Sequence, residues 1–256
     1  MPAVAALLDS RAALGALRRS LPRGSAPVVA CRSTSGLERV VSSRLLEVIV
    51  LGPIAARRLD LAALKARYPA IPVVAYGILR SEDSELLLGW NRLPLAAVLV
   101  EGVDDPVAGD LVLRHSVSAR RRAALGDAPR LLRLTEPLQR ATWDRLIRAG
   151  GRPPRAARLA RDIGVSREHL SRQFGAGGAP NLKRVADLLS VLAALSLLAN
   201  PGYTVNQVAR LLRFSTPSHL RAMVRRITDL GLPEAQKLGE RDVLSRFLRS
   251  GARSRA

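Results

Sequence analysis

Two stretches in the second half of the chain repeat one pattern: a helix, a tight turn and a second helix. They span Ala156–Phe174 and Thr204–Ile227, and a long apolar helix is predicted between them. In each stretch a small residue of the first helix, Ala160 or Ala209, lies six residues before a serine. A small residue lets two helices cross closely, and a short turn sends the second helix off at a steep angle, from which it can enter a DNA major groove. The pattern therefore predicts a DNA-binding protein.

The charge distribution supports this prediction. Residues 1–110 hold 13 Lys or Arg against 11 Asp or Glu, whereas residues 111–256 hold 28 against 10, so nearly all of the net charge of +20 lies with the repeats. A basic domain neutralises phosphates and releases counterions, which gives affinity for DNA of any sequence. Codon bias can explain why 38 of the 41 basic residues are Arg, but it does not explain the asymmetry between the halves.

The first half of the chain predicts a different architecture. Four short apolar runs, rich in β-branched residues, alternate with helical patterns: the runs are 27–31, 47–51, 72–76 and 96–100, and the helical patterns are 36–46, 60–68, 82–90 and 106–115. Such alternation indicates an open parallel sheet covered by helices on both faces, a flavodoxin-like α/β domain over residues 1–118. The Ala/Leu/Arg-rich residues 1–20 are expected to form its first helix rather than a transit peptide.

The order and spacing of these elements resemble the receiver domain of bacterial response regulators over about the first 115 residues. Receivers carry a phosphate-accepting Asp after the third strand, where this chain has Leu51-Gly52-Pro53. They hold Mg²⁺ on an acidic pair after the first strand, and that strand is expected to be missing here. Gly77 and Glu101 stand where receivers have a hydroxyl and a Lys. The resemblance therefore implies a degenerate module for dimerisation or sensing, without phosphoryl chemistry, and another small α/β fold remains open.

A strand end in this domain offers one further hypothesis. Arg32, Ser33 and Thr34 follow a predicted strand and have the chemistry to bind an anionic effector. An ordinary solvated turn between strand and helix explains the same residues, and both interpretations stay open.

Residues 119–134 are expected to be a basic linker, because they contain Arg120-Arg121-Arg122 and show no sustained period. The arginines are interpreted either as a solvated run or as an extra phosphate contact. Thr135 is the predicted N-cap of a helix that ends at Ala149, with Pro137 in its first turn and a buried face that includes Leu138, Trp143 and Leu146. A DNA-binding domain is thus predicted over 135–240, followed by a basic tail over 241–256.

Residues 155–235 resemble the AraC/XylS family of bacterial transcription regulators. The first unit, ARDIGVSREHLSRQF, is similar to the family's A-x-x-x-G-V-S-x-x-x-L-x-R-x-F, and the second, VARLLRFSTPSHLRAMVRR, is similar to V-A-x-x-x-G-F-S-x-x-S-x-F-x-R-x-F-K-K. The second unit departs from the pattern at Arg213, Leu220, Ala222 and Val224, which replace a turn Gly, a Phe, an Arg and a Phe. The resemblance implies an all-α domain whose two helix-turn-helix units, joined by a linking helix at 181–199, read successive major-groove segments.

Each unit has one recognition helix with a buried side and an exposed side. The first is capped by Ser166 and the second by Thr216, with Leu170 and Phe174, or Leu220 and Val224, facing inward. The residues predicted to contact DNA are Arg167, Glu168, Ser171, Arg172, Ser218, His219, Arg221 and Arg225. Arg172 matches the family's Arg and can bind guanine or a phosphate. Arg167 and Glu168 are equally well explained as a solvated pair, and Arg225 and Arg226 are expected at phosphates rather than bases.

Other classes of protein find little support in the sequence. The only imidazoles, His115, His169 and His219, lie beside no nucleophile motif, and Cys31 has no metal-ligand companions, so neither enzyme activity nor a metal or cofactor is expected. A single cysteine fits a reducing compartment, and the apolar helix at 188–199 is too short to span a bilayer. A cytoplasmic bacterial protein without membrane association is expected.

The predicted function is a sequence-specific transcription regulator of the AraC type that is not controlled by aspartate phosphorylation. Its predicted partner is double-stranded DNA, with RNA polymerase and a second copy of the chain, bound through the N-terminal domain, as further partners. The alternative is an AraC-like module whose second unit has lost base recognition, and which acts mainly through protein contacts while binding DNA non-specifically.

Overall fold

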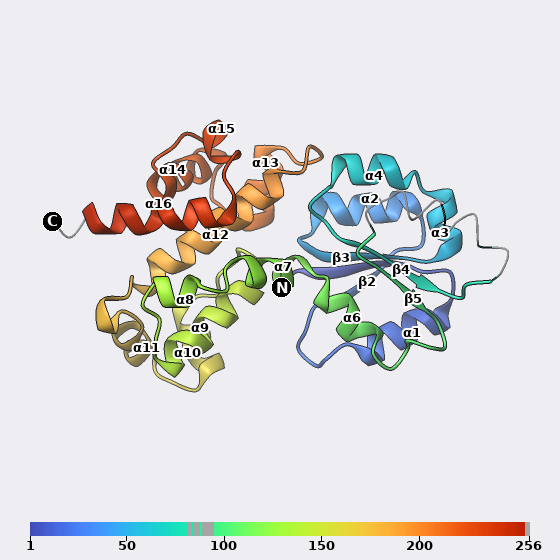
Figure 1. Cartoon of the computed structure of the whole chain (residues 1–256), viewed down its shortest axis with the longest axis horizontal. Helices are drawn as coiled ribbons and strands as arrows, with labels where there is room; N and C mark the ends of the chain where they lie inside the picture. Colours follow the sequence, from blue (N-terminus) through green and yellow to red (C-terminus); the bar gives the residue numbers. More distant parts are fainter. Residues whose placement is uncertain (81–82, 84–87, 89–94, 254–256) are drawn as a thin grey trace. The chain divides into compact units, whose positions relative to one another are not determined.

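The computed structural model describes residues 1–80, 83, 88 and 95–253 (Figure 1). The chain divides into two compact units. We call Met1–Arg120 together with Asn200–Tyr203 the N-terminal domain, and Arg121–Ala199 together with Thr204–Ala256 the C-terminal domain. No helix in the described ranges is long and apolar enough to cross a membrane.

The N-terminal domain is built on a five-stranded sheet whose paired strands all run parallel. The strand order is β2-β1-β3-β4-β5, and the strands are β1 (Ala3–Leu7), β2 (Val28–Ala30), β3 (Leu46–Leu51), β4 (Val73–Gly77) and β5 (Ala97–Val100). This is the flavodoxin-like order, in which the connections change direction between β1 and β3. The predicted open, receiver-like parallel sheet is therefore confirmed.

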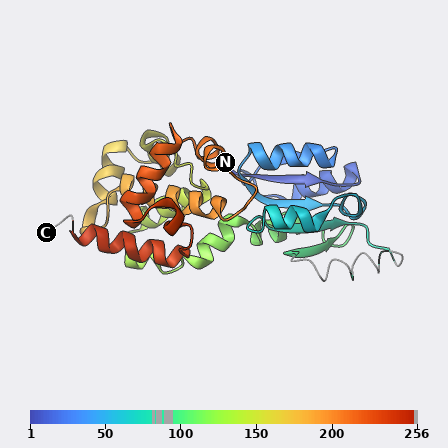
Figure 2. The same cartoon turned by 90° about the horizontal axis from the view of Figure 1, so that it is seen from above.

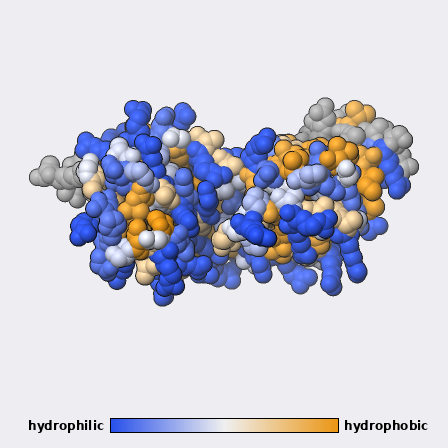
Figure 3. Space-filling model, turned by 90° about the horizontal axis from the view of Figure 1, so that it is seen from below, coloured by the Kyte–Doolittle hydropathy of each residue, from blue (hydrophilic) through white to orange (hydrophobic). Residues whose placement is uncertain are grey.

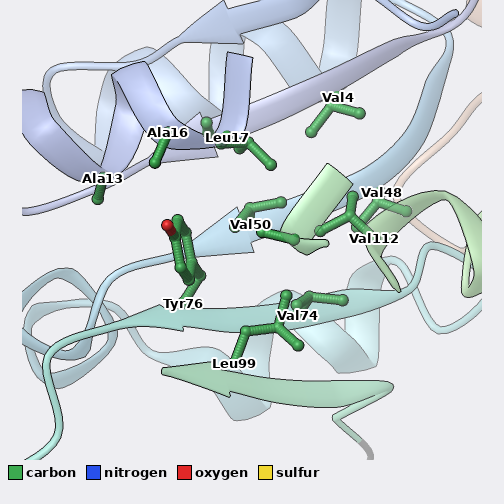
Figure 4. Packing of buried hydrophobic residues seen from close by; sticks show 12 residues of the cluster. Val4, Ala13, Ala16, Leu17, Val48, Val50, Val74, Tyr76, Leu99 and Val112 are labelled. Atoms are coloured by element: carbon green, nitrogen blue, oxygen red, sulfur yellow. The ribbon is translucent and has the colours of Figure 1, made fainter. Parts of the chain in front are cut away.

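Helices cover both faces of this sheet (Figures 1 and 2). On one face lie α1 (Arg11–Ser20) and α6 (Ala108–Arg114), and on the other α2 (Thr34–Ser43), α3 (Pro53–Arg58) and α4 (Leu61–Arg67). The side chains of α1 and α6 meet those of the strands in a core that includes Val4, Leu17, Val50, Val74 and Val112 (Figure 4). The helix expected at 82–90 lies almost entirely outside the described residues.

The expectation that the first strand is missing is wrong. Residues 3–7, expected to belong to a helix, form β1, which pairs with both β2 and β3 at the centre of the sheet. The sequence AVAAL has one β-branched residue and favours a helix by intrinsic propensity. All five residues are buried, however, and small side chains let helices pack closely on both faces of a central strand. Tertiary packing therefore overrides the local preference.

The C-terminal domain is helical. Its helices are α7 (Val117–Ala124, which begins at the end of the N-terminal domain), α8 (Ala128–Leu131), α9 (Pro137–Arg148), α10 (Ala156–Ile163), α11 (Arg167–Phe174), α12 (Leu182–Leu198), α13 (Val205–Leu212), α14 (Pro217–Thr228), α15 (Leu232–Ala235) and α16 (Glu240–Arg253). The linking helix α12 is the centre of the domain and contacts α9, α13, α14 and α16. Its buried apolar residues include Val185, Leu188, Leu189, Leu192, Leu195 and Leu198.

The segment expected as an irregular basic linker contains the helices α7 and α8. Within its arginine run, Arg120 and Arg122 are exposed, whereas Arg121 is buried and its Nε donates to Glu240 Oε1 of α16 at 3.2 Å. The predicted N-cap at Thr135 is wrong by one residue. Glu136 is the N-cap, because the Gln139 Oε1 accepts a hydrogen bond from the Glu136 N at 3.0 Å.

Exposed apolar side chains are concentrated on one of the two domains. Seven of the eight large exposed hydrophobic residues found in the described ranges belong to the N-terminal domain: Met1, Ile54, Ile78, Leu88, Val98, Val103 and Val107. The N-terminal domain also shows the larger expanse of hydrophobic surface in Figure 3. Self-association through this domain stays a prediction, and this surface is compatible with it.

Candidate nucleic-acid interface

The two helix-turn-helix units close their turns with the same backbone hydrogen bonds. In the first unit Val165 N donates to Ala160 O at 3.0 Å, and in the second Phe214 N donates to Ala209 O at 2.9 Å. Both alanines are buried, so the following helix can pack against them. The residue before each donor has a left-handed backbone, as expected for this type of helix end. The two units that repeat in sequence therefore also share the same turn hydrogen bond and backbone conformation.

The first recognition helix, α11, begins as predicted. The Ser166 Oγ accepts from His169 N at 3.1 Å, which satisfies one of the free N–H groups at the start of the helix. Leu170 and Phe174 have no exposed surface, and they share one face because they are four residues apart. Arg167, Glu168, Ser171 and Arg172 are all exposed, and Arg172 lies on the side of the helix opposite Leu170 and Phe174.

The second recognition helix, α14, repeats this arrangement with different side chains. The Thr216 Oγ1 accepts from His219 N at 3.0 Å, and Pro217 occupies the first helical position. Leu220 and Val224, which stand at the family's Phe positions, are completely buried. Smaller apolar residues thus fill the same part of the core.

All four residues predicted to contact DNA from α14 are exposed: Ser218, His219, Arg221 and Arg225. The His219 ring is nevertheless held in place, because its Nδ1 lies 3.0 Å from Ser215 Oγ and its edge meets the Phe214 ring with centroids 5.6 Å apart. Ala222 is also exposed and offers the groove only a methyl group. All eight residues predicted to contact DNA are thus exposed, four on each recognition helix, as contact with DNA requires. The contacts themselves stay predictions.

Arg226 differs from its neighbours on α14. Its Nη2 lies 2.7 Å from Asp187 Oδ2 of α12, so its guanidinium is already paired with a carboxylate of this chain, although the side chain remains exposed. Burial raises the pKa of the Asp187 carboxyl, although the charge of Arg226 acts in the opposite direction. The pair therefore forms, but burial of the Asp187 carboxyl offsets much of what the pair contributes to stability.

Gln139 of α9 binds the end of the first recognition helix, a role that was not predicted from the sequence. The Gln139 side chain is 1% exposed, and its Nε2 lies 3.3, 3.0 and 3.3 Å from the carbonyl oxygens of Gln173, Phe174 and Ala176. Gln173 and Phe174 end α11 and Ala176 follows it, where the regular helical hydrogen bonds stop. The carbonyls of Gln173 and Ala176 also accept the backbone N–H groups of Gly175 and Ala179. The spacing of Glu136 and Gln139 was the available sequence signal, since it is typical of a helix start.

At the C-terminal ends of the strands in the N-terminal domain, the carboxylate of Asp9 has a structural role. Asp9, after β1, accepts hydrogen bonds from Ile54 N at 2.9 Å and Ala55 N at 3.0 Å and so caps α3. A Cβ atom added to Gly52 would overlap the Asp9 carboxylate. Among the described residues, no group of three or more His, Cys, Asp or Glu side chains could hold a metal ion.

The anion site considered at the end of β2 is a capped helix start. Ser33 is the N-cap of α2, and its Oγ accepts from Gly36 N at 3.1 Å. Arg32 and Thr34 flank this residue, and Arg32 is exposed. The cap accounts for the position of the Ser33 hydroxyl, and an anionic effector bound by Arg32 and its neighbours stays an untested alternative.

Comparison with known proteins supports the helical domain in particular. Residues 159–234 match the family model of a helix-turn-helix domain. This match covers both units and the helix between them, and it indicates a DNA-binding transcription regulator rather than an enzyme. No curated protein matches the chain.

A solved structure with weak similarity is that of full-length FixJ from B. japonicum. It is 13% identical, covers 83% of this chain and 96% of that chain, and superposes with a TM-score of 0.38. So weak a superposition carries no argument about fold or function, and the architecture of the N-terminal domain rests on its own strand order.

Proposed function

We propose that this chain is a sequence-specific transcription regulator of the AraC type, in which α11 and α14 bind successive major-groove segments of one DNA duplex. The observation that carries the proposal is the repeated turn geometry, which leaves a capped recognition helix exposed in each unit. A basic domain supplies the affinity for phosphates, and the exposed polar side chains of the two helices supply the base contacts.

Arg172 is the residue on which we expect recognition to depend most. It is exposed on α11, two residues before the buried Phe174 and so on the opposite side of the helix from it, and has no ion-pair partner among the described residues. Its guanidinium is therefore free to make the bidentate contact with guanine O6 and N7 that arginine forms in major grooves. A contact of this kind is worth about 1–3 kcal/mol of discrimination against a wrong base.

The test is recovery of genomic DNA fragments by the purified protein, followed by sequencing. We expect a shared motif of two short boxes about one helical turn, ~34 Å, apart, and loss of one box in Arg172→Ala. The matched control is Arg249→Ala, which removes the same charge from an exposed position on α16. Recovery of the same fragments without a motif by all three proteins would reject sequence-specific binding.

The N-terminal domain is proposed to act without aspartate phosphorylation. Gly52 and Pro53 follow β3, so no carboxylate is present at the position of the receiver's phosphate acceptor. The carboxylate of Asp9 is committed to α3, and it occupies the space that a side chain at residue 52 would need. Control by another route, such as self-association, is compatible with this arrangement.

The alternative function has one observation in its favour. Ala222 is exposed on α14 where the family's pattern has an Arg, so this helix lacks one hydrogen-bond donor for base recognition. A module that binds DNA non-specifically and acts through protein contacts would show equal affinity for the recovered fragments and for random duplexes at every salt concentration. A specific regulator would lose its non-specific binding first as salt is raised.

A further inference from the structure

The turn of the second helix-turn-helix unit contains a strained arginine. Arg213 ends α13 with φ 61° and ψ 34°, in the left-handed region. Its counterpart in the first unit is Gly164, with φ 82°. Glycine adopts this conformation without a steric cost, whereas a residue with a Cβ atom is strained there. An arginine at this strained position suggests that its side chain has a functional role that offsets the cost of the backbone conformation.

The environment of Arg213 lacks negative charge. The residue is exposed, and among the described residues no carboxylate forms an ion pair with its guanidinium. A second arginine, Arg152, lies at the same turn, where its Nε donates to the Leu211 carbonyl oxygen near the end of α13. Burial lowers the pKa of the Arg152 guanidinium, and the positive charge of Arg213 lowers it further. Two cations thus share this turn without an anion between them.

The backbone holds Arg152 in this place. Gly150 and Gly151, which precede it, have φ of 61° and 82°. A Cβ atom on Gly151 would overlap the Cβ atom of Ala193 in α12 and lie 3.2 Å from Leu212 Cδ2. The loop before α10 is therefore packed tightly against α12 and α13, and Arg152 reaches the turn from a fixed position.

We propose that Arg213, with Arg152 behind it, forms a binding site for a phosphate of the DNA backbone. This inference rests on the proposed function. In a helix-turn-helix the first helix crosses the DNA backbone while the second enters the groove, so the turn between α13 and α14 lies where a phosphate is expected. The single negative charge of the phosphate would offset part of the positive charge that the two guanidinium groups bring together, and its contact would fix the position of α14 on the duplex without reading sequence.

The test uses the full chain and a recovered DNA fragment, with three variants. Arg213→Gly removes both the strain and the charge, and Arg213→Lys keeps the charge. Arg133→Gly is the matched control, because Arg133 is also exposed and also left-handed, with φ 57°. Each protein is unfolded in urea, and its DNA affinity is measured by fluorescence anisotropy between about 50 and 200 mM salt, the range over which counterion release is marked.

We expect Arg213→Gly to unfold at the same or a higher urea concentration than the wild type and yet to bind DNA more weakly. The slope of log K against log salt should fall by about 0.9, the value for one phosphate contact, so the affinity loss should be roughly threefold larger at 50 mM than at 200 mM. Arg213→Lys and Arg133→Gly should keep the slope of the wild type.

Two results would overturn the inference while the proposed function stands: an unchanged slope in Arg213→Gly, or an equal fall in slope in Arg133→Gly, which would assign the effect to net charge. A lower urea midpoint for Arg213→Gly would also overturn it, because the arginine would then have a structural role. Failure of the wild type itself to bind the fragment would reject the proposed function and this site together.

Discussion

The hydrogen bonds of Gln139 predict a large loss of stability when its amide is removed. The side chain is 1% exposed; its Nε2 faces three carbonyl oxygens at the end of α11, and its Oε1 accepts from Glu136 N. Two N–H groups and one acceptor are therefore lost in Gln139→Leu. A net value of about 0.5–1.5 kcal/mol for each hydrogen bond gives an expected cost of roughly 2–4 kcal/mol in the free energy of unfolding.

The chain contains a matched control for this change. Gln207 closes the capping box of α13, where its Oε1 binds the N and Oγ1 of Thr204, and no carbonyl contact of its amide nitrogen is seen in the described ranges. Gln207→Leu should therefore cost only about 0.5–1.5 kcal/mol, the value of the helix start alone. Urea unfolding followed by circular dichroism measures both variants. Equal costs would refute the conclusion that the Gln139 amide holds the end of the first recognition helix.

A third variant separates hydrogen bonding from shape. Gln139→Glu places a carboxyl group of the same size against three carbonyl oxygens, so its folded-state pKa should rise above the usual value of about 4.3. An acid whose pKa is raised on folding loses stability as pH increases through that range. We expect this variant to be closest to the wild type near pH 4 and clearly less stable at pH 7. A difference in unfolding free energy that does not change with pH would show that solvent reaches the side chain at residue 139, and it would contradict the expected rise in pKa.

Two further predictions concern carboxylates elsewhere in the chain. Asp9→Ala should lower the free energy of unfolding by about 1–2 kcal/mol through loss of the cap of α3. Treatment of the wild type with acetyl phosphate and Mg²⁺ should leave its DNA affinity unchanged. A phosphoryl adduct on Asp9 in the mass spectrum would contradict the expectation that the domain acts without aspartate phosphorylation. Asp187→Asn should change stability by less than about 1 kcal/mol at pH 7, because burial of the carboxyl opposes its ion pair with Arg226. Since the folded-state pKa of Asp187 is raised above 3.8, the wild type should gain stability relative to this variant as pH falls towards 4; urea unfolding across that range would detect the opposite trend.

The parts of the fold that were predicted correctly are specified by neighbouring residues. The caps at Ser166 and Thr216 and the buried pairs four residues apart are local patterns, and the structure has both recognition helices where these patterns begin. The four strands predicted from β-branched runs are likewise local. Their alternation with helices was enough to predict the parallel sheet.

The parts that were missed depend on partners far away in the sequence. Strand β1 is Ala-rich and takes its conformation from β2 and β3 on either side. Arg121, in a run interpreted either as solvated or as a phosphate contact, is buried and pairs with Glu240, 119 residues later. The carbonyl contacts of Gln139 reach residues 34 to 37 positions away. No periodicity or cap marks such contacts, so a single sequence predicts them poorly.

If the proposed function holds, the differences between the two helix-turn-helix units predict that the two units contribute unequally to base discrimination. The first unit has a relaxed glycine turn at Gly164 and an exposed Arg172 on its recognition helix. In the second unit, the residue at the corresponding position between the buried pair is Ala222, with Arg221 and Arg225 exposed nearby, and a further arginine, Arg213, stands at the turn. A guanidinium on the helix can read bases, whereas one at the turn can bind only the backbone. It follows that base discrimination should be concentrated in the half of the motif that α11 contacts. Single-base changes in the box that α14 contacts should cost less affinity than changes in the box that α11 contacts, and the α14 half should contribute more to the salt dependence of binding.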